Sequence, residues 1–250
     1  MRIFLLTMML LTPSWSLAAE ELVTLATRQS IPPYVNAGAV GGIEIDIVSA
    51  IFAEANIPVK FEQMPHVRML PSFVRGRVDG VLTQSATNKT AGCATDWYMA
   101  HTNVGISLAS NNFRISKLSD LHNRTVVAFV GAKGGLHPDY GEAVGKSPQY
   151  FEGDFQTTHV ELIYKRRFDV AIGDEWILRL AQREHFDRTG MYAELRIHTI
   201  LKPSLFSARF YEQETCDRFN AALKRLRVSG AYDAIMTKHH ERIAIPGGMR

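Results

Sequence analysis

Apolar residues in the first third of the chain recur in two patterns: short runs typical of strands and spaced positions typical of helices. Ile43, Ile47 and Ile51 recur at the spacing of one helix face, which predicts a helix over residues 43–56. The neighbouring elements are predicted to be strands over 22–27, 58–64 and 78–84 and a helix over 66–75. Strands and helices that alternate in this way predict a parallel sheet with helices on both faces.

A second unit with the same alternation follows Asn111-Asn112. Its elements are predicted to be helices over 116–121, 156–167 and 174–188, strands over 125–130 and 168–173, and a flexible glycine-rich turn over 131–135. The end of the chain predicts a return strand over 205–211 and helices over 212–228 and 231–240. The residues alone therefore predict successive α/β units.

The start of the chain has the composition of a secretory signal. Arg2 precedes an apolar run over residues 3–11, and Ser16-Leu17-Ala18 offers a small-residue cleavage site. The run is shorter than a membrane-spanning helix requires; an uncleaved anchor is the alternative. We expect residues 1–18 to be removed as a signal peptide and the mature protein to be soluble and periplasmic.

Composition and charge argue against several other classes. The formal net charge is +3 and the basic residues are scattered, which does not indicate a nucleic-acid-binding surface. The nine histidines lack zinc-ligand spacing, so we expect no metal and no cofactor. In an oxidising compartment Cys93 and Cys216 are expected to form a disulfide, with two buried free thiols as the alternative.

Three motifs in a fixed order carry most of the functional information. IPPY over residues 31–34 follows the first strand, GIEID over 42–46 opens the first helix, and GRVDG over 76–80 follows the second helix. In this order the motifs resemble the amino-terminal lobe of the periplasmic solute-binding proteins of family 3, which are type II, polar-amino-acid-binding proteins. The resemblance extends through Lys238.

The resemblance implies an α/β fold of two lobes, each a mainly parallel sheet flanked by helices, as in type II periplasmic binding proteins. Lobe 1 is then discontinuous, with residues 19–108 and 205–250, and lobe 2 holds residues 109–204. The chain is expected to cross between the lobes near residues 107–112 and 199–205.

Ligands of open α/β sheets bind beyond the carboxyl ends of the strands, where Tyr34 and Asp174 are predicted to lie. The resemblance implies that the Tyr34 ring stacks on the ligand. The alternative is that the ring only packs against the turn and has a structural role. It also implies that Asp174 holds the ligand's ammonium group. A carboxylate at this position would equally cap the next helix.

The chain departs from the family where an arginine usually clamps the ligand's carboxylate, between Thr83 and Tyr98. Lys89 is the only basic residue in this window, which argues against a standard α-amino acid as the ligand. Lys89 or Arg68 could replace the missing arginine, and the alternative for Arg68 is a solvated charge on a helix face. The remaining candidate ligand contacts are Ser85, Tyr98, Lys133 and Trp176.

We therefore expect a monomeric periplasmic protein that closes over a small polar, amino-acid-like ligand by a hinge motion and presents it to an ABC permease or a membrane sensor. No covalent chemistry and no catalytic residue are expected. One alternative is an enzyme on the same scaffold that resembles cyclohexadienyl dehydratase, with Glu44, Asp174 or Glu175 as general acid. Another is a ligand-sensing domain.

Overall fold

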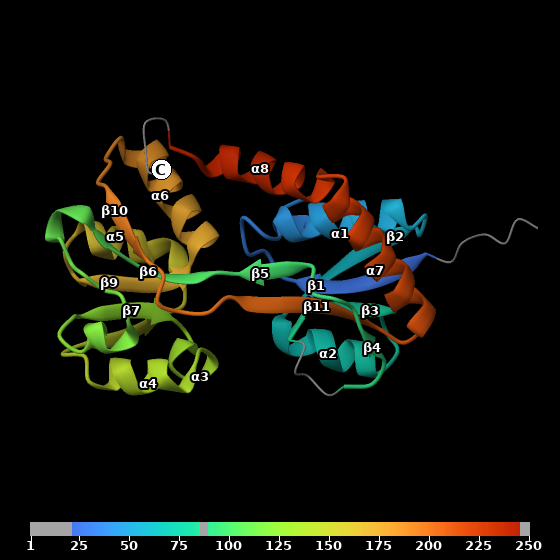
Figure 1. Cartoon of the computed structure of the whole chain (residues 1–250), viewed down its shortest axis with the longest axis horizontal. Helices are drawn as coiled ribbons and strands as arrows, with labels where there is room; N and C mark the ends of the chain where they lie inside the picture. Colours follow the sequence, from blue (N-terminus) through green and yellow to red (C-terminus); the bar gives the residue numbers. More distant parts are fainter. Residues whose placement is uncertain (1–21, 86–89, 246–250) are drawn as a thin grey trace, which may run out of the picture.

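The structure is a computed structural model that describes residues 22–85 and 90–245 (Figure 1). The predicted signal peptide over residues 1–18 and the candidate ligand contact Lys89 lie outside the described residues. Within the described ranges, no helix combines the length and the hydropathy needed to cross a lipid bilayer.

The described strands form two mixed sheets that lie side by side (Figure 1). The strands of the first sheet are β1 (Val23–Arg28), β2 (Val59–Met64), β3 (Gly80–Ser85), β4 (Cys93–Ala94), β5 (Met99–His101) and β11 (Ser204–Phe210). The strands of the second sheet are β6 (Asn103–Leu108), β7 (Val126–Phe129), β8 (Tyr150–Gly153), β9 (Val170–Asp174) and β10 (Leu195–His198). The two sheets confirm the predicted two-lobed α/β fold class.

Each sheet combines a parallel part with antiparallel strands. The order in the first sheet is β2-β1-β3-β11-β4, with β1 parallel to β2 and β3, and β11 antiparallel to β3. The order in the second sheet is β10-β6-β9-β7-β8, with β7 parallel to β8 and β9, and β6 antiparallel to β9 and β10. The antiparallel members include β6 and β11, the strands by which the chain enters the second sheet and returns to the first.

The chain changes sheets at two places that are close in space (Figure 1). The first change lies at Thr102, between β5 and β6, and the second lies between β10 and β11. Residues 103–108, which the resemblance placed in lobe 1, pair with β9 and β10 of the second sheet. The difference arises because β5 and β6 form one nearly continuous extended run, and hydropathy does not mark the point at which such a run changes partners.

Helices cover both faces of each sheet. Those around the first sheet are α1 (Ile43–Glu54), α2 (His66–Val74), α7 (Gln213–Val228) and α8 (Ala231–Ile243). Those around the second are α3 (Ala132–Gly135), α4 (Pro138–Gly145), α5 (His159–Tyr164) and α6 (Glu175–Thr189). Ile43, Ile47 and Ile51, which predicted α1, are buried against α7 residues such as Phe219. Burial of these apolar faces supplies the main stabilisation of the fold.

Several local predictions need correction. Residues 131–135, predicted to be a flexible turn, form the helical turn α3 after Gly131, whose φ of 84° suits glycine. Strand β8 was not predicted, and the helix expected over 156–167 divides into a 3-10 turn and the shorter α5. Helix α1 ends at Glu54, two residues before the predicted end, and Asn56 follows it with a left-handed φ of 52° that asparagine tolerates.

The disulfide Cys93–Cys216 is present and joins β4 to α7 within the first lobe. The sulfur atoms are covalently linked across a sequence separation of 123 residues. The loop that this bond closes contains the whole second sheet, so the bond holds together two segments of the first lobe that flank the second.

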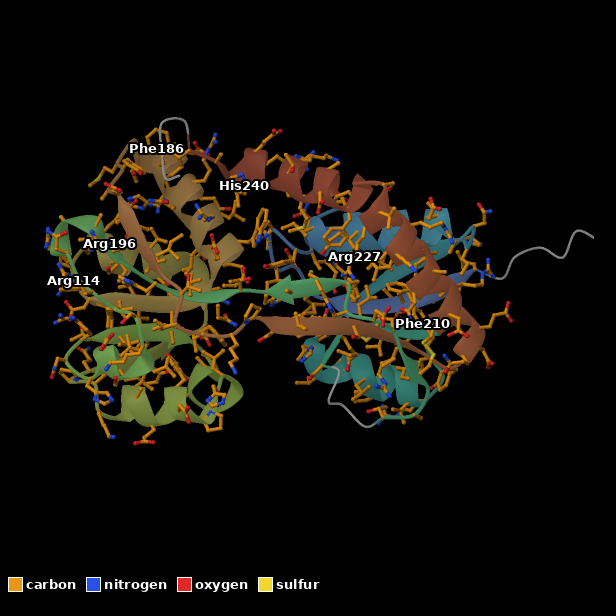
Figure 2. The ribbon with its side chains drawn as sticks, viewed as in Figure 1. Arg114, Phe186, Arg196, Phe210, Arg227 and His240 are labelled. Carbon is orange, nitrogen blue, oxygen red and sulfur yellow. A yellow bond between two sulfur atoms is a disulfide. The ribbon has the colours of Figure 1, made fainter. Side chains whose placement is uncertain are left out.

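The last described helix, α8, reaches from the first lobe to the second (Figure 1). It packs with α1 and α7 of the first lobe, and its residue His239 is hydrogen-bonded to Asp46 of α1 at 2.9 Å. The next residue, His240, is labelled in Figure 2, and its ring lies 5.9 Å from the ring of Trp176 on α6. Arg183 of α6 donates a hydrogen bond of 2.7 Å to the carbonyl of Ala244, so α8 contacts both lobes.

Candidate ligand-binding cleft

A cavity of about 460 Å³ lies between the two lobes, at the carboxyl ends of β1, β3, β7 and β9. Its walls come from both lobes and include residues next to both crossings, such as His101 and Ser204. The lining residues are Arg28, Ile31, His66, Thr83, Gln84, Ser85, His101, Asn103, Phe129, Gly135, Leu136, Gln156, Asp174, Ile177, Ser204 and Phe206. Its volume and its mixture of apolar and polar walls suit a small organic molecule.

A second cavity of about 440 Å³ lies at the opposite end of the first sheet, where Leu22, Tyr211 and Thr215 are among its lining residues. Residues of the first lobe alone line it, so a molecule bound there would not be enclosed between the lobes. The cavity between the lobes is therefore the candidate site.

Tyr34 and Asp174 meet across the gap between the lobes. The Tyr34 hydroxyl donates to the Asp174 carboxylate and lies 2.9 Å from each of its oxygens. Tyr34 is 1% exposed and Asp174 is 2% exposed, so the contact is shielded from water. The Tyr34 ring also packs on the His101 ring, with 4.2 Å between ring centroids. The two side chains predicted to contact the ligand thus contact each other.

Local backbone geometry positions the Tyr34 turn. The amide of Ile43 donates to the carbonyl of Pro33, and the amide of Glu44 donates to the carbonyl of Tyr34. A Cβ on Gly42 would lie 2.3 Å from the Tyr34 carbonyl oxygen, and its φ is 115°. Only glycine allows the start of α1 to approach the turn this closely.

Asp174 caps α6, as its position after β9 suggested. Its Oδ1 accepts hydrogen bonds from the backbone amides of Trp176 at 3.0 Å and Ile177 at 3.1 Å. Burial raises the pKa of Asp174 to about 7, although the hydrogen bonds from Tyr34 and the two amides oppose that rise. With the Tyr34 contact, its carboxylate already accepts bonds from three protein groups.

A cationic group faces the same cavity. Arg28 is the last residue of β1, is half-buried, and lines both this cavity and an adjoining one of about 380 Å³. Burial lowers the pKa of Arg28 and the charge of Glu44 raises it, and a guanidinium stays charged at neutral pH. Burial and then the charge of Arg28 also lower the pKa of His101, to about 3, and the pKa of His66 falls for the same two reasons.

A buried acid lies beneath this cationic side of the cleft. Glu44, which is 1% exposed, accepts a hydrogen bond of 2.7 Å from Thr83 and another from the Tyr98 hydroxyl. Burial raises the pKa of Glu44 against the effect of those bonds. Tyr98 is fully buried and supports the cleft floor through Glu44 and the Thr83 amide, without lining the cavity.

The sequence model of the family described as bacterial extracellular solute-binding proteins, family 3, matches residues 23–242. The chain belongs to this family. A comparison of this family 3 protein with curated proteins finds no significant match.

Several solved structures share the fold of this family 3 protein. An ancestral cationic amino acid solute-binding protein, AncCDT-1, is 18% identical at a TM-score of 0.68, over 87% of this chain and 94% of that one. The probable amino-acid ABC transporter extracellular-binding protein ytmK from Bacillus subtilis is 17% identical at a TM-score of 0.68, over 88% of this chain and 97% of that one. A histidine kinase sensor domain with similarity to periplasmic binding proteins is 19% identical at a TM-score of 0.64, over 88% of this chain and 96% of that one. At these identities the likeness establishes the fold alone.

The structure brings some of the predicted site residues of this family 3 protein to the cavity and leaves others outside it. Ser85 and Asp174 line the cavity, and Tyr34 lies directly behind Asp174. Arg68 and Lys133 are exposed and do not line it, and Trp176 packs toward α8. The Lys133 backbone amide is hydrogen-bonded to Glu152 at 2.8 Å.

Sequence reasoning missed Arg28, His101 and Phe206, which line the cleft. Arg28 could have been found, because it directly follows the first predicted strand at the edge where ligands bind. His101 and Phe206 lie on paired strands β5 and β11, and nothing in the local sequence indicates that pairing. Within the described ranges, no group of three His, Cys, Asp or Glu side chains is placed to hold a metal ion.

Proposed function

We propose that this family 3 protein is an extracytoplasmic solute-binding protein that captures a small polar solute between its lobes and releases it unchanged. The observation that carries the proposal is the cavity between the lobes, whose lining includes residues of both sheets. A molecule held there would contact both lobes at once, so its binding would favour the closed arrangement. The candidate contacts are Ser85 and Asp174, with Tyr34 behind them and Lys89 outside the described residues.

Hinge closure is proposed to occur at the two crossings, near Thr102 and residues 199–203. Two adjacent extended connections allow the lobes to rotate while the core of each stays intact. The hydrogen bond between Tyr34 and Asp174 joins the lobes directly and would break when they separate. The proposed lobes are residues 19–102 with 204–250, and residues 103–203.

The proposed partner is an ABC permease in the inner membrane. Membership of a family of extracellular solute-binding proteins supports this role, and so does the likeness to the ytmK protein, which is described as part of an amino-acid ABC transporter. The likeness to a histidine kinase sensor domain supports a membrane sensor as the other partner. Export with removal of residues 1–18 as a signal peptide is part of the same proposal.

An enzymatic role is the second candidate, because AncCDT-1 is described as a precursor of cyclohexadienyl dehydratase. The cavity offers one acid among its lining residues, Asp174, and its pKa of about 7 would let it carry a proton at neutral pH. Glu44 is buried beneath the cavity, and Glu175 is paired with Arg179 at 2.7 Å outside it. We propose binding without turnover, since the Asp174 carboxylate is engaged by Tyr34 and the start of α6.

Native mass spectrometry of the freshly purified protein tests this function. We expect a mass increment of one small molecule per monomer, which disappears after unfolding and returns when the released molecule is added to refolded protein. Incubation for hours should return the molecule with its mass unchanged. A changed mass would favour the enzyme, and a protein that never binds any small molecule would contradict solute binding.

A further inference from the structure

We propose that the solute is a small organic anion with a compact apolar body, and that Arg28 binds its anionic group. This inference rests on the proposed solute-binding function and adds the chemical class of the solute. It differs from the expectation of an amino-acid-like ligand, whose ammonium group Asp174 would hold.

The first support is the placement of Arg28. It ends β1 at the floor of the cleft and lines both the main cavity and the adjoining one, so its side chain faces the volume that a solute would occupy. No carboxylate in the described parts of the chain lies within 4.0 Å of its guanidinium. A half-buried cation without an ion-pair partner gains most from an anion that arrives with the ligand.

The nearby acids do not neutralise Arg28. Glu44 attracts it electrostatically, but the Glu44 carboxylate is buried below the cavity and accepts bonds from Thr83 and Tyr98. Asp154 lines the adjoining cavity and is exposed to solvent. Water screens an exposed carboxylate, so Asp154 offsets little of the Arg28 charge.

The second support is that the described lining of the main cavity offers no free carboxylate to hold an ammonium group. Asp174 is the acidic side chain among the lining residues of the main cavity, and it is 2% exposed. Its oxygens accept bonds from the Tyr34 hydroxyl and from two backbone amides of α6. An ammonium group would therefore compete with these donors for the carboxylate.

The third support is the apolar part of the wall. Its side chains come from both lobes, and they are Ile31, Phe129, Leu136, Ile177 and Phe206. Asn103 and Ser204, the first residues of β6 and β11, add polar groups. A cavity with one cation, a few hydrogen-bonding groups and an apolar wall suits a carboxylate attached to a branched or aromatic body.

Calorimetric titration with matched probes tests the inference. The probes are benzoate and 3-methylbutanoate, their neutral amides, and the amino acids leucine, glutamine and arginine, together with any molecule released from the purified protein. We expect carboxylates to bind and the amide of the same body to bind at least about tenfold more weakly, because the charge-assisted bond to Arg28 is lost. Arg28→Gln should weaken carboxylate binding to a similar degree.

Two variants control for indirect effects. Arg28→Lys keeps the charge without the fork geometry and should bind carboxylates with intermediate affinity. Arg68→Gln removes an exposed arginine outside the cavity and should leave affinity unchanged. Each variant should melt near the temperature of the wild-type protein when no solute is present.

The outcomes separate this inference from the function on which it rests. Equal binding of an amino acid or a neutral solute by the wild type and by Arg28→Gln would overturn the anion assignment and leave solute binding intact. If no probe binds and no molecule is released from the purified protein, solute binding itself fails, and the inference fails with it.

Discussion

Replacement of Cys93 and Cys216 by alanine together is expected to lower the free energy of unfolding by about 2–5 kcal/mol. The bond closes a loop across 123 residues, so its loss restores considerable conformational freedom to the unfolded chain. Because the bond joins β4 to α7, we expect its removal to destabilise mainly the first lobe. Chemical denaturation of both forms measures the difference.

The wild-type protein treated with a reductant is the control for the double variant. Both should show the same decrease in stability, and the reductant should not change the variant further. A reduced wild-type protein as stable as the oxidised one would mean that the bond contributes nothing to folding.

Replacement of Asp174 by alanine is expected to lower the free energy of unfolding at neutral pH by about 1–3 kcal/mol, through the loss of the α6 cap and of the acceptor for the Tyr34 hydroxyl. Asp174→Asn keeps an oxygen for both backbone amides and should be much closer to the wild type. Thermal melting of the two variants compares them. If the two variants lower the stability equally, Asp174 does not act as a helix cap and hydrogen-bond acceptor.

A comparison of the wild-type protein with Asp174→Asn separates the charge of Asp174 from its hydrogen bonds. Its pKa rises from 3.8 to about 7 on folding, so between these values the folded protein binds more protons than the unfolded chain. The wild-type protein should therefore lose stability relative to Asp174→Asn as the pH rises through this window, with no further change above about pH 7. A difference that does not vary with pH would show that Asp174 ionises normally in the folded protein.

The sequence predicted the fold well because the fold depends on periodic patterns. The isoleucines of α1 identified a helix, and the alternation of strands and helices identified two α/β units. The division between lobes was less predictable, since residues 103–108 are apolar and extended on either assignment. Their partners, β9 and β10, lie far along the chain, and only tertiary structure determines that pairing.

The candidate cleft was predictable where it depends on strand ends and less so elsewhere. Tyr34 and Asp174 each follow a strand, and parallel strands present their carboxyl ends at the same edge. Arg68 was a weaker candidate because Met69 and Phe73 form the buried face of α2 and turn Arg68 to solvent. The lining by His101 and Phe206 depends on the pairing of β5 with β11, across about a hundred residues of sequence, which no local pattern encodes.

Hydrogen exchange with and without the solute that the protein releases tests enclosure between the lobes most directly. We expect bound solute to slow amide exchange in both lobes at once, near residues 82–85 of the first and near residues 134–137 of the second. Exchange near Tyr211 and Thr215, at the cavity on the far end of the first sheet, should stay the same. Protection confined to one lobe, or centred on that far cavity, would contradict the account.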